Sequence, residues 1–108
     1  MTDATITVEQ LKDTFKKFAQ ERGWQKLKPK DLSMDIVSES CELMDLFIYK
    51  YDEELMQTLS KDRQEIENEV ADIAFALFNF CSTFNIDLCK AVEHKLKLTA
   101  QKYPPKGV

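Results

Sequence analysis

Apolar residues recur three or four positions apart along most of this chain, and no segment sustains the alternation of a half-buried strand. Recurrence of this kind is typical of amphipathic helices that bury one face. Only two glycines and three prolines occur, and they fall near the ends of the apolar segments. Since glycine and proline mark turns and helix ends, the pattern predicts an all-α fold with four main helices.

The first expected helix runs roughly from Val8 to Arg22, and signals for both of its ends are present. Thr7 and Gln10 have the spacing of a capping box, in which each side chain bonds the backbone N–H of the other residue. Gly23 follows the last turn, where a left-handed backbone commonly ends a helix. We expect residues 23–30 to form a connector. The positions expected to face inward are Val8, Leu11, Phe15 and Phe18.

Two longer apolar segments predict the second and third helices. The second begins near Asp31 or Ser33, which are both favourable N-cap residue types, and continues to about Tyr49. The third starts near Lys61 and extends to about Thr83, and its aromatic residues make it the most buried helix expected. The intervening residues 51–60 are polar and irregular in pattern, so no helix is assigned to them.

The fourth helix has clear limits. Asp87 can cap its start, and it runs to about Lys102. Pro104 and Pro105 then prevent its continuation, because proline lacks the backbone N–H that a helix needs. His94, the sole histidine, lies between two charged residues on this helix. We expect it to be exposed and to have no catalytic role.

Length and charge narrow the functional classes. The 108 residues predict one domain, residues 1–108, small enough for a second copy to help bury its apolar surface. The net charge of −4 gives a nucleic-acid polymer no electrostatic attraction. No segment is long and apolar enough to span a bilayer, and the polar residues 1–10 do not resemble a secretory signal. Three cysteines without C-x-x-C spacing fit reduced thiols in the cytoplasm.

Two acidic pairs lie in the two most apolar segments: Glu39 with Glu42, and Glu69 with Asp72. Residues three apart share one side of a helix, so each pair falls within an apolar stripe. Four carboxylates that face each other there lose hydration and repel, unless protons or cations neutralise them. Because oxygen-only ligands favour Mg²⁺ or Mn²⁺, the pattern predicts a divalent metal site. The alternative is two ordinary solvated faces.

The spacing of these acids resembles a family signature. An E-x-x-E motif followed after 26 residues by E-x-x-D is similar to that of the all-α nucleoside triphosphate pyrophosphatases, the MazG and dCTP pyrophosphatase-like group. The likeness runs from about Leu11 to Pro104. Its further matches are Phe18–Trp24 with F-x-x-E-R-x-W, Glu42–Phe47 with E-L-x-E-L-F, and Ile86–Leu88, Lys95 and Lys102–Pro104 with the family's last helix.

The resemblance implies a bundle-like MazG-type fold that assembles as homodimers or homotetramers. It implies hydrolysis of a nucleoside or deoxynucleoside triphosphate to the monophosphate and pyrophosphate, as in nucleotide-pool house-cleaning. Mg²⁺, or alternatively Mn²⁺, would be held by catalytic acids at Glu39, Glu42, Glu69 and Asp72. A strict preference for dCTP does not carry over, because the chain departs from the family pattern at Ser38, Tyr49, Ala76 and Thr99.

Five further residues are candidates for binding the substrate. One face of the last helix carries Lys95, Thr99, Lys102 and Tyr103. We expect the two lysines to neutralise phosphate oxygens, although lysines near a helix C-terminus are also expected for dipole reasons. Trp24, the sole tryptophan, has the family position of a base-stacking residue, and the alternative for it is a core anchor.

Two other functional classes compete with the hydrolase. A di-iron carboxylate bundle needs E-x-x-H pairs, and the residue three positions before His94 is Ala91, so this class is excluded. A non-catalytic helical interaction module, which keeps the fold and uses the acids for structure or cation binding, is the remaining alternative.

Overall fold

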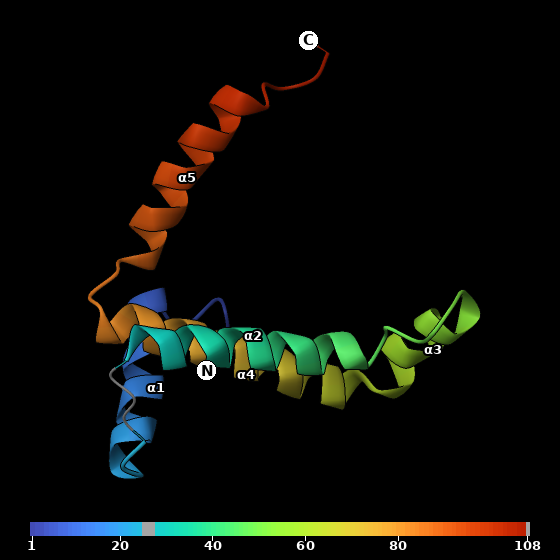
Figure 1. The fold of residues 1–108 in the computed structure, drawn as a ribbon, viewed down its shortest axis with the longest axis horizontal. Helices are drawn as coiled ribbons and strands as arrows, with labels where there is room; N and C mark the ends of the chain where they lie inside the picture. Colours follow the sequence, from blue (N-terminus) through green and yellow to red (C-terminus); the bar gives the residue numbers. More distant parts are fainter. Residues whose placement is uncertain (25–27, 108) are drawn as a thin grey trace.

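The computed structural model describes residues 1–24 and 28–107, and this part of the chain contains five α-helices and no strand. They are α1 (Val8–Glu21), α2 (Pro29–Asp45), α3 (Glu53–Lys61), α4 (Arg63–Thr83) and α5 (Leu88–Lys102). In Figure 1, α2 and α4 lie side by side, α1 crosses them near one end, α3 lies at the other end, and α5 extends away. The all-α prediction is confirmed, but one chain does not form a closed four-helix bundle.

The expected limits of α1 agree closely with the structure. The Thr7 hydroxyl accepts a hydrogen bond from the Gln10 backbone N–H at 3.1 Å, and the Gln10 side chain accepts one from Thr7 at 2.8 Å. Gly23 has a φ of +67°, the left-handed conformation that glycine adopts without strain. The inward stripe is only partly confirmed, because Val8 and Phe18 are exposed.

Helix α2 begins and ends earlier than the sequence indicates. It starts at Pro29, whose fixed φ and missing N–H suit the first helical position, and it ends at Asp45 instead of about Tyr49. Leu32 in its first turn is completely buried. Residues 25–27 of the predicted connector lie outside the described residues.

The sequence pattern assigned no helix to residues 51–60, and this prediction is wrong, because α3 occupies most of the segment. The nine-residue helix packs against α4. Thr58 is buried, and its hydroxyl donates to the Glu54 carbonyl oxygen at 2.8 Å and accepts from Lys50 at 3.0 Å. Lys50 also pairs with Asp62 at 3.8 Å, so the side chain of a residue that precedes α3 contacts the C-terminal part of this helix.

Helix α4 is central to the fold, as the aromatic pattern predicts. It contributes the buried residues Ala76, Phe78 and Cys81, and Phe75 packs edge-on against Phe15 of α1 with ring centroids 5.0 Å apart. No helix in the described part of the chain has the length and apolar character that crossing a bilayer requires.

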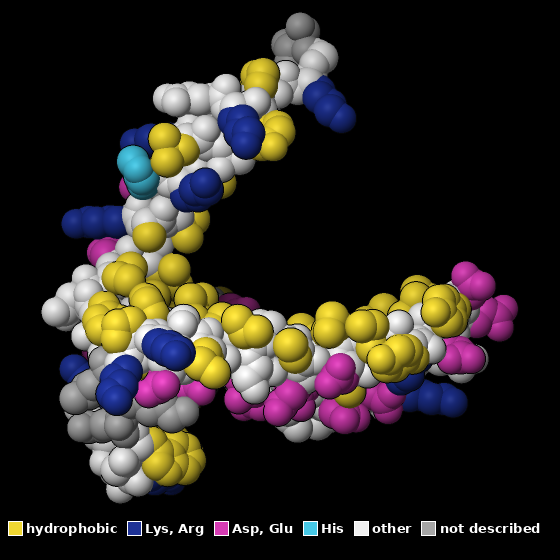
Figure 2. Space-filling model, viewed as in Figure 1, with side chains coloured by type: hydrophobic (Ala, Val, Ile, Leu, Met, Phe, Trp, Pro, Cys, Tyr) yellow, Lys and Arg dark blue, Asp and Glu magenta, His cyan; other side chains and the backbone are white. Residues whose placement is uncertain are grey.

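Helix α5 starts as predicted, with the Asp87 side chain accepting from the Lys90 N–H at 3.0 Å. It buries none of its residues, and His94 is exposed as expected. Figure 2 shows hydrophobic side chains along the hollow between α5 and the α2–α4 layer. The large apolar side chains that are more than 60% exposed, apart from Met1, are Val37, Tyr49, Tyr51, Met56, Leu96 and Tyr103.

The isolated chain is open for its size. Its radius of gyration is 17.0 Å, whereas a compact chain of this length has about 13 Å. Its accessible surface is 8828 Å², whereas about 6,200 Å² is expected for a compact monomer of this mass. The excess surface includes much of α5.

Candidate functional site

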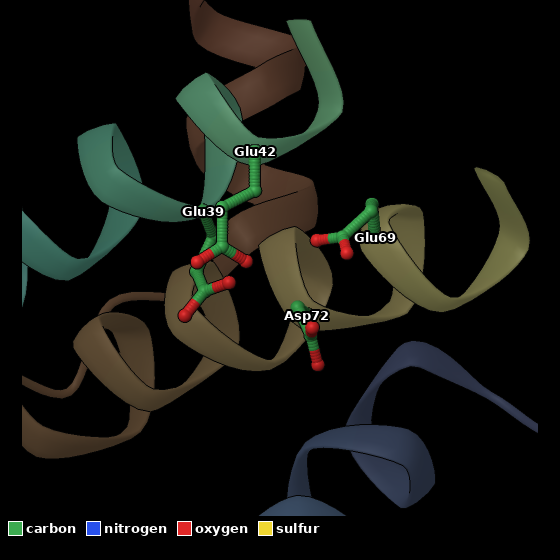
Figure 3. Close-up of side chains that lie close together, drawn as sticks. All are labelled: Glu39, Glu42, Glu69 and Asp72. Carbon is green, nitrogen blue, oxygen red and sulfur yellow. The ribbon is translucent and has the colours of Figure 1, made fainter. Parts of the chain in front are cut away.

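Four carboxylates meet between α2 and α4. Figure 3 shows Glu39 and Glu42 reaching from α2 toward Glu69 and Asp72 on α4. Each residue offers one carboxylate oxygen, and these four oxygens all lie within 4.8 Å of one another. The i, i+3 spacing within each helix and the side-by-side packing of the helices produce this cluster.

The carboxylate cluster, Glu39, Glu42, Glu69 and Asp72, has no internal counter-charge. None of the ion pairs in the described part of the chain involves these four residues. Oxygen Oε2 of Glu69 is buried and makes no hydrogen bond to any described group. A buried carboxylate oxygen without a donor is costly, so the cluster favours an external cation or a proton.

The same crowding perturbs proton binding. Burial raises the pKa of the Glu39 carboxyl, and the neighbouring carboxyls of Glu42 and Asp72 raise it further. Burial likewise raises the pKa of Glu69, and contact with Glu42 adds to the effect. Protons and divalent cations therefore compete for the same oxygens.

An open pocket of about 730 Å³ adjoins the cluster. Glu39 and Asp72 form part of its wall, and they connect the pocket directly to the carboxylate cluster. The remaining lining residues are Phe18, Gly23, Trp24, Asp35, Phe75, Ala76 and Asn79. A cavity that is acidic at one end and aromatic along its wall suits a ligand with an anionic, metal-binding group and a planar ring.

The aromatic wall of the pocket comes from α1 and the residues that follow it. The rings of Phe18 and Trp24 meet edge-on with centroids 5.8 Å apart. The guanidinium of Arg22 lies 3.5 Å from the centre of the Phe18 ring. Trp24 is 56% exposed, so the core-anchor interpretation does not fit, and much of its indole is accessible to a ligand.

Comparison with known proteins agrees with this geometry. A pyrophosphatase from Archaeoglobus fulgidus DSM 4304, known from its crystal structure, superposes with a TM-score of 0.84 at 30% identity, over 97% of this chain and 99% of that chain. dCTP pyrophosphatase 1 of Rattus norvegicus is 31% identical over 101 residues, and that of Bos taurus is 33% identical over 101 residues. No protein-family model matches the chain.

The chain belongs to the all-α, MazG-like nucleoside triphosphate pyrophosphatase family. The matched segments cover 91% of this chain but only 59% of the rat relative and 60% of the bovine one. The chain thus spans less than two thirds of the length of these curated relatives.

Not all of the candidate residues of this MazG-like chain come together. Trp24 lines the same pocket as Glu39 and Asp72, and the other two residues of the carboxylate cluster, Glu42 and Glu69, adjoin it. Lys95, Thr99, Lys102 and Tyr103 do not line that pocket, because α5 points away from α2 and α4 within one chain (Figure 1). Their role in binding substrate stays a prediction, and it requires α5 of another copy to approach the site.

The structure also brings in pocket residues that the sequence patterns did not assign to the site, namely Phe18, which was expected only to face inward, Phe75 and Asn79. Asn79 lies seven residues after Asp72, two helical turns along the same face. That spacing is the one signal by which it could have been found, and it becomes informative only when the direction of the pocket is known.

Proposed function

We propose that this chain is a divalent-metal-dependent pyrophosphohydrolase that converts a nucleoside or deoxynucleoside triphosphate and water to the monophosphate and pyrophosphate. The observation that carries the proposal is the carboxylate cluster at the end of an aromatic-walled pocket. The names of the relatives support the same chemistry. Residues 1–108 would form a single domain with this activity.

The cluster suits Mg²⁺ as the resident ion, with Mn²⁺ as the alternative. It supplies only hard oxygen ligands, Glu69 Oε2 has no other described partner, and no described lysine or arginine pairs with the four acids. We propose that Glu39, Glu42, Glu69 and Asp72 hold the ion. When bound, it would neutralise the triphosphate and activate the attacking water.

The protein's own residues have four tasks in this proposal. The pocket wall holds the nucleoside, with Trp24 stacking on the base. The cluster places the triphosphate at the α2–α4 seam, and a carboxylate that is not fully engaged by the ion accepts the proton of the attacking water. Lys95 and Lys102, with Thr99 and Tyr103, would contact the phosphates from a neighbouring copy.

We propose that the chain forms a homo-oligomer, either a dimer or a tetramer, and its open surface supports this proposal. The chain exposes about 2,600 Å² more than a compact monomer of its mass. Obligate homodimer interfaces typically bury about 2,000–5,000 Å². We further propose a cytoplasmic location, which fits the three free cysteines, and a role in nucleotide-pool house-cleaning.

The decisive test is hydrolysis by the purified protein. The full chain is incubated with Mg²⁺ and a panel of canonical and modified nucleoside triphosphates, and release of pyrophosphate and monophosphate is followed. We expect pyrophosphate release that EDTA abolishes and that Asp72→Asn removes while the helical circular dichroism signal stays intact. Asp13→Asn, which changes an exposed acid on α1, is the matched control and should keep the rate.

The opposite results identify the competing function. A folded protein that releases no pyrophosphate from any nucleotide would support the non-catalytic helical interaction module. Full activity of Asp72→Asn would show that Asp72 is not needed for catalysis and would contradict the proposed role of the carboxylate cluster.

A further inference from the structure

We infer that Asn79, together with Asp35, reads the edge of the nucleobase and makes the pocket selective for bases that carry an exocyclic amino group. This inference rests on the proposed function, because it assumes that the pocket receives a nucleotide. It deepens that function by naming the base class and the residues that choose it.

The position of Asn79 follows from the direction of the pocket. On α4 the pocket wall continues from Asp72 through Ala76 to Asn79, one helical turn at a time. On α2 it continues from Glu39 back to Asp35, again by one turn. Seven residues of helix place Asn79 about 10 Å from Asp72 along the axis. A nucleoside spans a comparable distance between its 5′-phosphate and the far edge of its base.

The aromatic residues lie beside the same part of the pocket. Phe18, Trp24 and Phe75 line the pocket together with Asn79, and Phe18 and Trp24 are 43% and 56% exposed. A ring held against such a wall directs its polar edge, not its face, toward the groups at the end of the groove. The base therefore meets Asn79 and Asp35 with its hydrogen-bonding edge.

The side chain of Asn79 is suited to this task. It is half-buried, and within the described residues its carboxamide makes no hydrogen bond, although its backbone carbonyl accepts one from Thr83 at 2.8 Å. A carboxamide offers two donors and an acceptor in one plane. It can donate to a ring nitrogen of a base or, when it turns, accept from a ring N–H, so Asn79 binds the base edge and leaves the choice between bases to Asp35.

Asp35 decides which bases fit. An ionised carboxylate only accepts hydrogen bonds, so it favours a donor on the base, such as the amino group of cytosine or adenine. Asn79 can then donate to the adjacent ring nitrogen. Uracil and hypoxanthine present a carbonyl oxygen and a ring N–H at these positions. The arrangement thus predicts discrimination between bases of equal size that differ in a single substituent.

Binding of monophosphates tests the inference without any chemistry. Trp24 is the only tryptophan and lines the pocket, so its fluorescence reports binding to the full chain in the presence of Mg²⁺. The ligands are two matched pairs, dCMP against dUMP and dAMP against dIMP. We expect the amino-bearing member of each pair to bind more tightly by about 5–150-fold, the range for one well-placed pair of hydrogen bonds to a base edge.

Three variants locate the source of the preference. Asn79→Ala should weaken the binding of all four monophosphates and change the two affinity ratios little, because its amide can turn to suit either base edge. Asp35→Asn, which keeps the volume of the side chain, should bring both ratios close to one, because it replaces a group that only accepts with an amide that can also turn. Asn68→Ala is the control: it makes the same change on the exposed side of α4, outside the pocket, and should leave both ratios as in the wild type.

The outcomes separate this inference from the proposed function. Equal affinity of the wild type for dCMP and dUMP, or affinity ratios that are unchanged in Asp35→Asn, overturns the proposed recognition of the base edge. Pyrophosphate release at equal kcat/KM from dCTP and dUTP does the same while leaving the hydrolase intact. A folded chain whose Trp24 fluorescence responds to no nucleotide and that releases no pyrophosphate overturns both.

Discussion

Replacing Glu39 with Gln should make the metal-free protein more stable, although it removes a residue of the proposed active site. The substitution keeps the shape of the side chain and deletes one charge from a cluster whose oxygens lie within 4.8 Å of one another. Since no described cation pairs with the cluster, the deleted charge leaves no broken ion pair behind.

The expected gain follows from the geometry. At 4.8 Å, two unit charges repel by about 0.9 kcal/mol in a medium with the dielectric constant of water, which suits these partly exposed groups. Three neighbours give the Glu39 carboxylate about 2.6 kcal/mol, and screening at physiological ionic strength reduces this to about 1.4 kcal/mol. For a domain of this size, a stabilisation of that magnitude raises Tm by about 5–10 °C.

The assay is thermal unfolding followed by circular dichroism at pH 8, first with EDTA and then with Mg²⁺. In EDTA, Glu39→Gln should unfold at a higher temperature than the wild type, whereas the exposed Asp13→Asn should change Tm little. Mg²⁺ should raise the Tm of the wild type and have less effect on Glu39→Gln, because a ligand that binds the folded state stabilises it by mass action. A Glu39→Gln variant that is less stable than the wild type in EDTA would refute the repulsion argument.

Three further predictions extend this reasoning. Because the pKa of Glu39 is raised above 4.5, the folded chain holds a proton that the unfolded chain releases. The wild type should therefore lose free energy of unfolding relative to Glu39→Gln as pH rises from about 4.5 toward neutrality, as measured by urea unfolding with EDTA. A difference in free energy of unfolding that stays constant with pH would contradict this. Leu32→Ala should lower the free energy of unfolding by about 2–5 kcal/mol, because Leu32 is completely buried. A loss of less than about 1 kcal/mol would mean that neighbouring side chains move in and fill the cavity. Lys95→Ala should raise KM or lower kcat. Mixing this variant with Glu39→Gln under conditions of subunit exchange should restore part of the rate, because some mixed sites then contain both native residues. If mixing restores no activity, Lys95 and Glu39 belong to the same subunit's site.

The sequence predicted those parts of the fold that depend on neighbours within one or two turns. The capping box at Thr7 and Gln10, the glycine after α1 and the Asp87 cap of α5 each act through hydrogen bonds between residues three apart. The acidic pairs belong to the same class, because the i, i+3 spacing alone places both members of a pair on one helix face.

Features that depend on distant contacts were not predictable in this way. Helix α3 has only nine residues, too few to be stable from its own propensity. Its support comes from packing on α4 and from Lys50, which bonds Thr58 and pairs with Asp62. Asn79 was missed for a similar reason, because a polar residue two turns beyond Asp72 has no evident role until the pocket connects them.

The separation of α5 from the carboxylate cluster has a chemical consequence. A lysine that reached the cluster from within the same chain would pair with its acids, supply the missing counter-charge and reduce the need for a divalent cation. The structure instead keeps the four acids without a described cationic partner and carries the cationic residues of α5 on a separate arm (Figure 2). If those lysines approach only from a neighbouring copy, the triphosphate can lie between cation and lysine, and its negative charge then keeps the acids and lysines from neutralising each other directly. Such a contact between copies would make oligomerisation a requirement of the proposed site as well as a way to bury apolar surface.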